Sequence, residues 1–334
     1  MAPDMRPASE LARTYKSQIK DKVVLTTGVS PGSIGAAFVQ AIASAEPGLL
    51  ILAGRNLDKL KATADIIAEV YPEVNIRTLL VDLGSFESVR SAAKVVLAWA
   101  DVPRIDVLIN NAAVMAIDWS VSLDGYDTQL VINHLGPFLF TNLVMSKLLK
   151  CPSPRIVNIT SDGHRLSPFR FDDYNFRDGE YYNKWQSYGQ SKTANMLMAI
   201  SLAENLGTQH KLSAFSVYPG LILTSGLASH LKLFGDSDAD LVAMMEIDRV
   251  MGNRVGFDGF EGSGITPKSA EVGANTYVFA AFDPEVTAHN GAYLQNCRVS
   301  DPLVDTVRPW ATSPIEAERL WRLSEKLVGQ SFSY

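Results

Sequence analysis

Short apolar segments alternate with helical segments from residue 23 onward, and this alternation limits the folds open to the chain. The apolar segments are continuous and rich in β-branched residues, which is typical of strands buried on both faces of a sheet. Strands are predicted at 23–27, 49–53, 76–81, 107–109, 155–159 and 212–217. Helices are predicted at 34–45, after Asn56, after Ser85 to about residue 99, at 124–147 and at 184–205. Because such strand–helix–strand units cross over right-handedly, the sequence predicts an α/β fold with a doubly wound parallel sheet of the Rossmann type.

The rest of the chain extends this sheet into a single domain with two appendages. No linker, repeat or low-complexity tract divides the 334 residues. We expect an N-terminal arm at 1–20, the Rossmann domain at 21–300 and a C-terminal extension at 301–334. The Gly-rich segment at about 225–265 suggests a substrate flap, and the alternative is a surface excursion. Thr266 and Pro267 form an N-cap and N1 pair, which predicts a helix to about residue 282.

The composition argues against several classes of protein. The net charge is −6, whereas a nucleic-acid binder usually carries a basic patch, so no nucleic-acid partner is expected. Cys151 and Cys297 are too few for a disulfide framework and lack metal-ligand spacing, so no metal site is expected. Residues 1–22 lack the apolar core of a signal peptide, and no apolar run approaches the roughly 18 residues that span a membrane. We therefore expect a soluble, cytoplasmic protein.

A glycine-rich turn joins the first predicted strand to the first predicted helix. Glycines let a backbone approach a pyrophosphate, and the N-terminus of the following helix offers free N–H groups and a positive dipole. The alternative is an ordinary tight turn, but the position between strand and helix favours a dinucleotide site. The predicted contacts in this turn are Thr27, Gly28, Ser30, Gly32, Ser33, Ile34 and Gly35.

The end of the second strand indicates which dinucleotide binds. An acidic residue about 20 positions after the glycine turn would bind the ribose 2′-OH of NAD, whereas an arginine suits a 2′-phosphate. Here Arg55 and Asn56 follow the strand and no acid does, so NADP(H) is predicted rather than NAD(H); the alternative is a solvated arginine. Asp82 and Leu83 could contact the adenine, unless Asp82 only caps a helix. The amides and small residues that follow the fourth strand suit a backbone close to the cofactor, unless they form a polar turn: Asn111, Ala112 and Ala113.

Tyr188 and Lys192 are the candidate reactive pair. They lie four residues apart on a predicted helix, so their side chains share one face. A nearby ammonium and a cationic nicotinamide would lower the pKa of Tyr188 from about 10. The spacing alone occurs often by chance. Ser161 follows the fifth strand at the ligand edge of the sheet, where it could donate to a substrate oxygen or serve only as a turn serine.

In this order along the chain, the motifs resemble the short-chain dehydrogenase/reductase family. Each motif is weak, but the ordered set is specific, and it covers about 20–225, with 266–300 weaker. The glycine turn departs from the family pattern because one extra residue separates Gly32 from Gly35, which leaves open which amides bind the pyrophosphate. The set consists of the turn at 27–35, Asp82-Leu83, Asn110 to Ala113, Asn133, Ser161, Tyr188 with Lys192, and Pro219-Gly220 followed by Thr224.

The resemblance implies a catalytic tetrad of Asn133, Ser161, Tyr188 and Lys192. Tyr188 would be the general acid/base, and Ser161 would orient the substrate carbonyl. Lys192 would lower the pKa of Tyr188 and bind the ribose, while Asn133 would hold a water in a proton relay. A homodimer or homotetramer is common in the family. Four further residues would lie beside the nicotinamide: Pro219, Gly220, Ile222 and Thr224.

Within the family, the chain is most similar to the branch of retinol dehydrogenases and protochlorophyllide reductases. Ser161 and Tyr188 lie farther apart than in most members, and the extra stretch at 164–185 is rich in aromatic residues. These aromatics indicate either an apolar substrate or a small core within the insert itself. They are Phe169, Phe171, Tyr174, Phe176, Tyr181, Tyr182 and Trp185.

The sequence therefore predicts an NADP(H)-dependent oxidoreductase that reduces a carbonyl, or oxidises the alcohol, of an apolar small molecule. Two alternatives remain. One is reduction of an activated C=C bond. The other is a non-catalytic NADP-binding regulator, which is disfavoured because degenerate members usually lose the tyrosine or the lysine.

Overall fold

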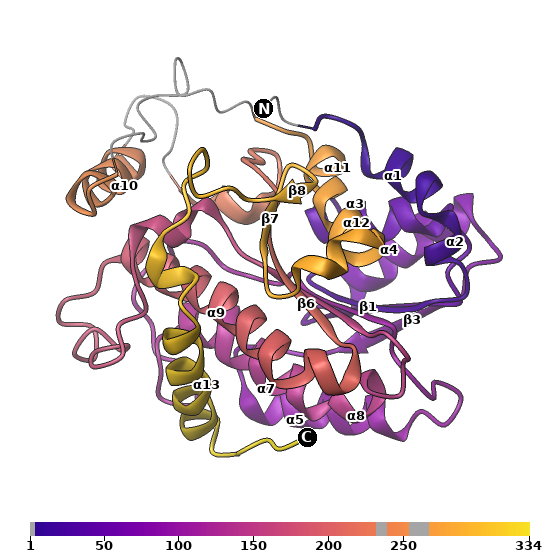
Figure 1. Ribbon diagram of the computed structural model, residues 1–334, viewed down its shortest axis with the longest axis horizontal. Coiled ribbons are helices and arrows are strands. Elements are labelled where there is room, and N and C mark those ends of the chain that lie inside the picture. The colour runs from indigo at the N-terminus through magenta and orange to yellow at the C-terminus, as the bar shows by residue number, and fades with distance from the viewer. Residues whose placement is uncertain (1–3, 232–238, 254–266) are drawn as a thin grey trace.

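An eight-stranded sheet forms the centre of the molecule (Figure 1). The computed structural model describes residues 4–231, 239–253 and 267–334. The strand order is β3-β2-β1-β4-β5-β6-β7-β8, and all neighbours pair in parallel except β7 with β8. The strands are β1 (Val23–Thr27), β2 (Leu49–Gly54), β3 (Ile76–Leu80), β4 (Val107–Asn110), β5 (Arg155–Ile159), β6 (Ser213–Tyr218), β7 (Tyr293–Gln295) and β8 (Arg298–Val299).

The predicted doubly wound α/β fold is confirmed, and each predicted strand lies within one residue of its observed bounds. Strand β1 pairs with β2 on one side and β4 on the other, so the chain reverses its direction of winding there. In open α/β sheets, ligands bind at the carboxyl ends of the strands at such a point. The short strands β7 and β8 were not predicted.

Helices cover both faces of the sheet (Figure 1). Because successive strand residues point to opposite faces, Leu50 and Leu52 join one core while Ile51 and Ala53 join the other. The first face carries α1 (Ala8–Thr14), α2 (Lys16–Ile19), α3 (Ile34–Ala43), α4 (Leu57–Val70), α11 (Ala270–Gly273) and α12 (Asn275–Phe282). The second face carries α5 (Phe86–Ala98), α7 (Gly136–Leu143), α8 (Met145–Leu148), α9 (Lys184–His210) and α13 (Pro314–Val328).

Side-chain caps set the start of several helices. The predicted caps are confirmed: Asn56 accepts a hydrogen bond from the Lys59 N–H, and Ser85 accepts one from the Ser88 N–H. The helix predicted to start at Thr266 and Pro267 begins instead at α11. Its cap is Ser269, which accepts from the Val272 N–H. Thr266 itself lies outside the described residues.

The helix predicted at 124–147 starts later and is not continuous. It begins with α6 (Thr128–Leu130), capped by Asp127, and continues through a π-helical turn at Val131–Leu135 into α7 and α8. Such single π turns occur frequently at functional sites. Here the turn contains Asn133.

The predicted flap at 225–265 is described only in part. Residues 232–238 and 254–265 lie outside the described residues. The described part contains a 3₁₀ turn at Gly226–Ala228 and one regular helix, α10 (Ala239–Val250). Helix α10 packs against α9 and against the 3₁₀ turn Asp162–Leu166 that follows β5.

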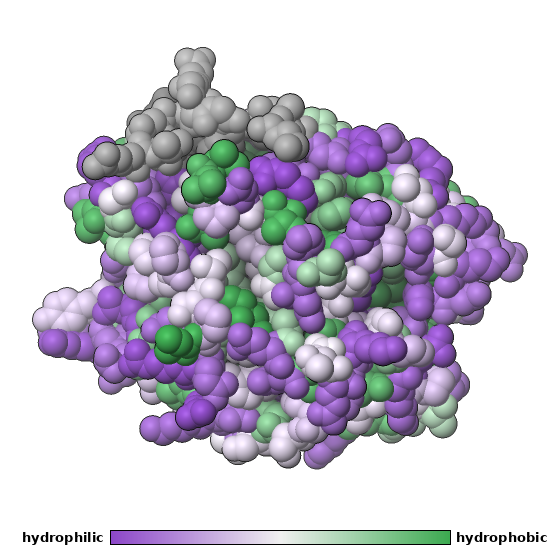
Figure 2. Space-filling model, in the orientation of Figure 1, coloured by the Kyte–Doolittle hydropathy of each residue, from purple (hydrophilic) through white to green (hydrophobic). Residues whose placement is uncertain are grey.

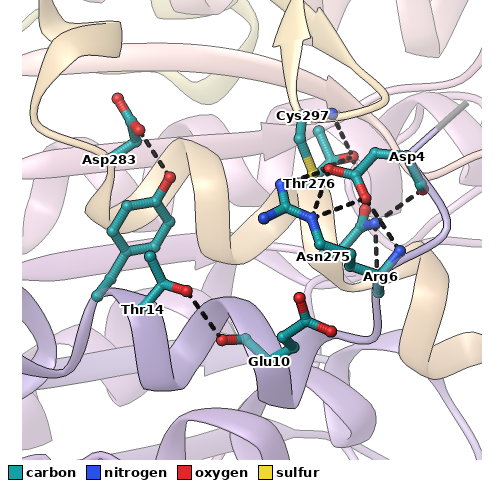
Figure 3. Close-up of polar contacts among 9 residues, drawn as sticks. Asp4, Arg6, Glu10, Thr14, Asn275, Thr276, Asp283 and Cys297 are labelled. Atoms are coloured by element: carbon teal, nitrogen blue, oxygen red, sulfur yellow. Dashed lines mark hydrogen bonds and ion pairs between the residues drawn. The ribbon is translucent and has the colours of Figure 1, made fainter.

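The N-terminal arm is fastened to α12 (Figure 3). The Asn275 Nδ2 donates to the carbonyl oxygens of Asp4 and Arg6, each at 3.0 Å, and the Tyr15 hydroxyl donates to Asp283 at 2.7 Å. Four apolar side chains of the arm are buried: Ala8, Leu11, Ala12 and Ile19.

Two further segments complete the structure. The C-terminal helix α13 packs on α9, and its Trp321 meets Phe138 of α7 edge to face at 4.9 Å. Short 3₁₀ turns occur at Glu285–His289 and Pro309–Ala311.

Most aromatics of the insert at 164–185 pack against one another or against neighbouring loops. For example, the Tyr182 ring lies 5.5 Å from Phe176 and 5.1 Å from Trp119.

Hydrophilic side chains cover most of the face shown in Figure 2, with apolar side chains scattered among them in small groups. Isolated exposed apolar residues, such as Leu123 and Leu303, are ordinary on a protein surface and do not by themselves indicate a partner. Within the described part of the chain, no helix has both the length and the apolar character needed to cross a membrane.

Candidate active site

A cleft of about 550 Å³ opens at the carboxyl ends of β1, β2, β3 and β4. It lies where the chain reverses its winding, which is the usual position of a ligand site in an open α/β sheet, and the predicted glycine turn borders it. The predicted cofactor residues that line it are Thr27, Gly28, Ser30, Ser33, Ile34, Arg55, Asn56, Asp82, Leu83, Asn111, Ala112 and Ala113.

Gly28 and Gly35 hold the glycine turn against the loop after β4. Gly28 has φ +73°, and a Cβ there would lie 2.7 Å from the Ala112 Cα. A Cβ on Gly35 would lie 2.5 Å from the Asn111 Nδ2. The prediction that Gly32 and Gly35 contact the cofactor is therefore not supported, because neither residue lines the cleft. Gly35 is turned toward Asn111, and Gly32 serves a left-handed bend with φ +78°.

Asn111 ties three segments together beneath the cleft. Its Nδ2 donates to the carbonyl oxygens of Thr27 and Gly28, each at 2.9 Å. Its Oδ1 accepts from the hydroxyl of Tyr277 on α12 at 3.0 Å. The sequence analysis missed Tyr277, because nothing in the local pattern separates it from the apolar residues around it.

We expect replacement of Tyr277 with phenylalanine to weaken NADPH binding roughly fivefold. The change removes only the donor to Asn111, and one neutral hydrogen bond contributes about 1 kcal/mol. Titration calorimetry of the variant with NADPH measures the loss. Tyr126→Phe is the control, because its hydroxyl donates to the Leu327 carbonyl away from the cleft. Equal affinity in both variants would show that the Asn111 contact is dispensable.

Two cations lie at the adenosine end of the cleft. Arg55 is exposed and lines the cleft beside the start of α4, as predicted. Lys59, which was not predicted, is also exposed and lies in the first turn of α4. In the described part of the chain, neither side chain pairs with a carboxylate. Lys59 could have been found from the sequence, because it follows the predicted cap Asn56 by three residues and so lies in the first turn of the helix beside Arg55.

Asp82 forms a local turn after β3. Its Oδ1 accepts from the Gly84 N–H at 2.9 Å, and its own N–H donates to the Ser88 hydroxyl at 2.9 Å. The alternative that Asp82 caps the next helix is wrong, because Ser85 has that role. Leu83 is buried and lines the cleft.

A second cavity, of about 160 Å³, adjoins the cleft and shares Ile34, Asn111 and Ala113 with it. Ser161, Tyr188 and Lys192 lie together on its wall. The opposite side is apolar. Among the aromatics of the insert, only Trp185 lines this cavity, so the packing favours the alternative of a small core within the insert for the others. The apolar lining also includes Met115, Leu166, Leu241 and Met244.

Tyr188 and Ser161 come from α9 and from the end of β5. The Tyr188 ring lies against Gly163, where a Cβ would come within 2.7 Å of the Tyr188 Cε1 and 3.3 Å of the Ser161 Oγ. The Ser161 Oγ accepts from the Gly163 N–H at 3.0 Å. Burial raises the pKa of Tyr188 to about 12, and a hydrogen bond with Ser161 opposes this shift.

Lys192 lies one helical turn after Tyr188. Its Nζ donates to the Ile159 carbonyl at 3.1 Å and lies 5.5 Å from the centre of the Tyr188 ring. Burial lowers the pKa of Lys192 to about 7. Burial is the first cause of the pKa shift of both groups, so the lowering of the Tyr188 pKa by Lys192 stays a prediction.

The third predicted partner, Asn133, is buried in the π-helical turn. Its Oδ1 accepts from the Val114 N–H at 2.8 Å. Its Nδ2 donates to the Val114 carbonyl and to the Ser191 hydroxyl, each at 2.9 Å. The side-chain amide thus joins the loop after β4 to α9. Both N–H groups of the Asn133 amide already donate to protein acceptors. These contacts therefore do not support the expectation that this side chain holds a water of the proton relay.

The loop after β6 closes the second cavity. Pro219, Gly220 and Ile222 line it as predicted, whereas Thr224 is exposed and lines neither cavity. Gly220 has φ +95°, and a Cβ there would lie 2.9 Å from the Lys268 Cδ. The close approach of these two segments requires glycine at this position.

Comparisons with known proteins agree with this geometry. Residues 22–175 match the family described as short chain dehydrogenase. A short-chain dehydrogenase/reductase of Penicillium rubens is 34% identical over 94% of this chain and 86% of that protein. The chain belongs to the short-chain dehydrogenase/reductase family. It is therefore an oxidoreductase of a family that uses NAD(P)(H).

Other relatives place this short-chain dehydrogenase/reductase in a retinol-dehydrogenase-like branch. Retinol dehydrogenase 12 of Bos taurus is 31% identical over 98% of this chain and 93% of that protein. A solved structure from Mycobacterium paratuberculosis, of an uncharacterized protein, has a TM-score of 0.67 at 26% identity, covering 95% of this chain and 97% of that one. A short chain dehydrogenase from Shigella flexneri, solved with NADP, has a TM-score of 0.59 at 19% identity, covering 85% and 100%.

Proposed function

We propose that this protein is an NADP(H)-dependent reductase of a carbonyl group on an apolar small molecule, with Tyr188 as the general acid/base. One observation carries the proposal. The hydroxyls of Tyr188 and Ser161 share the wall of an apolar cavity that adjoins the dinucleotide cleft.

The residues of the cleft fit a nicotinamide dinucleotide. The cleft follows a left-handed glycine turn and lies at the N-terminus of α3, where free N–H groups and a positive dipole favour a pyrophosphate. Arg55 and Lys59 supply charge for a 2′-phosphate, and Arg55 can bind it through a two-pronged hydrogen bond. The Shigella flexneri relative, of the same fold, was solved with NADP. When bound, the coenzyme supplies the hydride.

The proton chemistry rests on Tyr188, Ser161 and Lys192. With a pKa of about 12, the Tyr188 hydroxyl holds its proton at neutral pH and can donate it to a carbonyl oxygen during reduction. Ser161 accepts from the Gly163 N–H through an oxygen lone pair and keeps its own O–H, which can turn from Tyr188 to the same carbonyl oxygen when a substrate binds. The ammonium form of Lys192 would stabilise the phenolate left after the transfer.

The apolar lining of the second cavity supports an apolar substrate. Trp185, Leu241 and Met244 offer carbon surface and no charge, so a ketone or aldehyde with a hydrocarbon body would be favoured over a polar one. The name of one relative, retinol dehydrogenase 12, refers to an alcohol with a hydrocarbon body.

The direct test is NADPH oxidation by the purified protein with a panel of ketones, aldehydes and enones, followed by identification of the products. We expect alcohols from carbonyl compounds with hydrocarbon bodies. Saturated ketones from the enones would instead support C=C reduction. A lack of turnover despite NADPH binding would support the regulator.

A second expected result concerns cofactor choice. Replacing Arg55 and Lys59 with alanine should raise the Kd for NADPH roughly 10–100-fold, because charge-assisted hydrogen bonds contribute about 1.5–3 kcal/mol. The Kd for NADH should change little, since NADH carries no 2′-phosphate. Lys61→Ala is the control, because Lys61 is an exposed cation of the same helix that does not line the cleft. An equal loss of both coenzymes would contradict the assignment.

A further inference from the structure

A buried ion pair joins α10 to the loop that carries Ser161. The Arg165 Nε and Nη2 donate to the Asp248 Oδ1 and Oδ2 at 2.7 and 2.5 Å. Each of the two side chains is only 3% exposed. Arg165 belongs to the 3₁₀ turn Asp162–Leu166, directly after Ser161, and Asp248 lies near the end of α10.

The same guanidinium also contacts a residue that lines the second cavity. Its Nη1 donates to the Asp162 Oδ2 at 3.2 Å, and Asp162 lines the cavity beside Ser161. Arg165 is thus shared between a carboxylate at the cavity wall and a carboxylate on α10. Asn253 also bridges the two partners of the ion pair, because its Nδ2 donates to the Asp248 carboxylate and to the Arg165 carbonyl.

Helix α10 forms the apolar roof of the cavity. Leu241 and Met244 line it, and Met244 packs with Trp185 of α9 and Leu166 of the 3₁₀ turn. The other end of α10 is tied to α9 by the ion pair of Lys184 and Asp240. The position of the roof relative to Ser161 is therefore set by ion pairs at both ends of one short helix.

Stability alone is a poor explanation for the Arg165–Asp248 pair. Desolvating two charges costs about as much as their attraction returns, and apolar residues of similar size often stabilise a core equally well. What an apolar contact lacks is direction. A two-pronged guanidinium–carboxylate pair fixes both the distance and the angle between its two elements.

We propose that Arg165 is a positioning residue for substrate selection. Through its ion pair with Asp248, it fixes the position of α10, and so of Leu241 and Met244, relative to Ser161. The proposal rests on the proposed function, in that it assumes a carbonyl substrate held by Ser161. In the wild-type protein, Leu241 and Met244 would contact the part of the substrate that extends beyond the carbonyl. Loss of the pair would free α10 without disturbing Tyr188 or the coenzyme cleft.

The test uses Asp248→Asn in the full-length protein. Hydrogen exchange of the 239–250 peptide should become at least tenfold faster, while exchange in β4 and β5 stays unchanged. With NADPH as coenzyme, kcat/KM for 4-phenylcyclohexanone divided by kcat/KM for cyclohexanone should fall at least fivefold, because the KM for the larger ketone rises. The kcat for cyclohexanone should hold, because the small ketone does not reach the roof.

The control is Asp305→Asn, which breaks another two-pronged pair, that of Asp305 with Arg298. This pair lines neither cavity and is more exposed, at 11% for Asp305 and 24% for Arg298. Asp248→Glu keeps the charge and should restore part of the protection of α10. If α10 exchanges no faster in Asp248→Asn than in the control, the proposal is overturned even if neither ketone is a substrate. If exchange rises but the ratio stays within twofold of wild type, the role in selection is overturned. If Asp248→Asn fails to fold, Asp248→Glu decides by the same two measurements.

Discussion

Replacing Tyr188 with phenylalanine is expected to lower kcat for carbonyl reduction by about 10²–10⁴-fold, the usual contribution of a positioned general acid. The variant loses one hydroxyl from a ring that is almost fully buried, so the packing of α9 against Gly163 is kept. Coenzyme binding should change less than twofold, because the cleft is built from other residues. Single-turnover reduction with saturating NADPH, together with a separate coenzyme titration, measures the two effects.

Tyr182→Phe is the control for this experiment. Its hydroxyl donates to the Ile117 carbonyl and accepts from Gln129, and it lines neither cavity. We expect near-wild-type turnover from it. A Tyr188→Phe protein that binds NADPH and still turns over within tenfold of wild type would show that another group supplies the proton. Ser161 also presents a hydroxyl on the cavity wall.

Most of the sheet could be predicted because its signals are local. Buried parallel strands are continuous apolar runs, and the caps Asn56 and Ser85 mark helix starts within a few residues. Strands β7 and β8 could not be found, since they are only three and two residues long and carry no periodic pattern. The later start of the helix predicted at 124–147 depends on its cap Asp127, whose carboxylate accepts a hydrogen bond from the Ser187 hydroxyl of a distant segment.

The candidate site shows the same division between local and distant information. Ser161, Tyr188 and Lys192 were predicted from motif order, and the structure brings them to one cavity wall. Tyr277 and Asp248 were missed because their importance comes from partners far away in the sequence.

The upward shift that burial gives the pKa of Tyr188 could not be predicted, for a related reason. The sequence showed that a lysine lies one turn away, but it could not show how deeply both groups are buried. Desolvation raises the pKa of Tyr188 and lowers the pKa of Lys192.

That burial makes Lys192 costly to the fold. We expect Lys192→Met to stabilise the protein by about 3 kcal/mol at pH 7 while turnover falls by orders of magnitude. Burial lowers the lysine pKa from 10.5 to about 7, a penalty of about 4 kcal/mol. The hydrogen bond to Ile159 that is lost contributes about 1 kcal/mol. No carbonyl is orphaned, because the Asn195 Nδ2 also donates to Ile159 at 3.0 Å.

The pH dependence separates this effect from improved packing. Between about pH 7 and 10.5 the unfolded chain holds the Lys192 proton and the folded protein does not, so this group makes wild-type stability rise with pH. The advantage of Lys192→Met should therefore be largest at or below pH 7 and nearly vanish at pH 10. Lys147→Met is the control, because the Lys147 side chain is also buried. Among the described residues, the Lys147 ammonium is the only donor to the Val102 carbonyl. Its removal leaves that carbonyl without a partner, so this variant should be less stable than the wild type. Urea unfolding of the wild type and the two variants at pH 6, 8 and 10 measures their free energies of unfolding. If the extra stability of Lys192→Met does not change with pH, packing rather than desolvation of the charge is responsible.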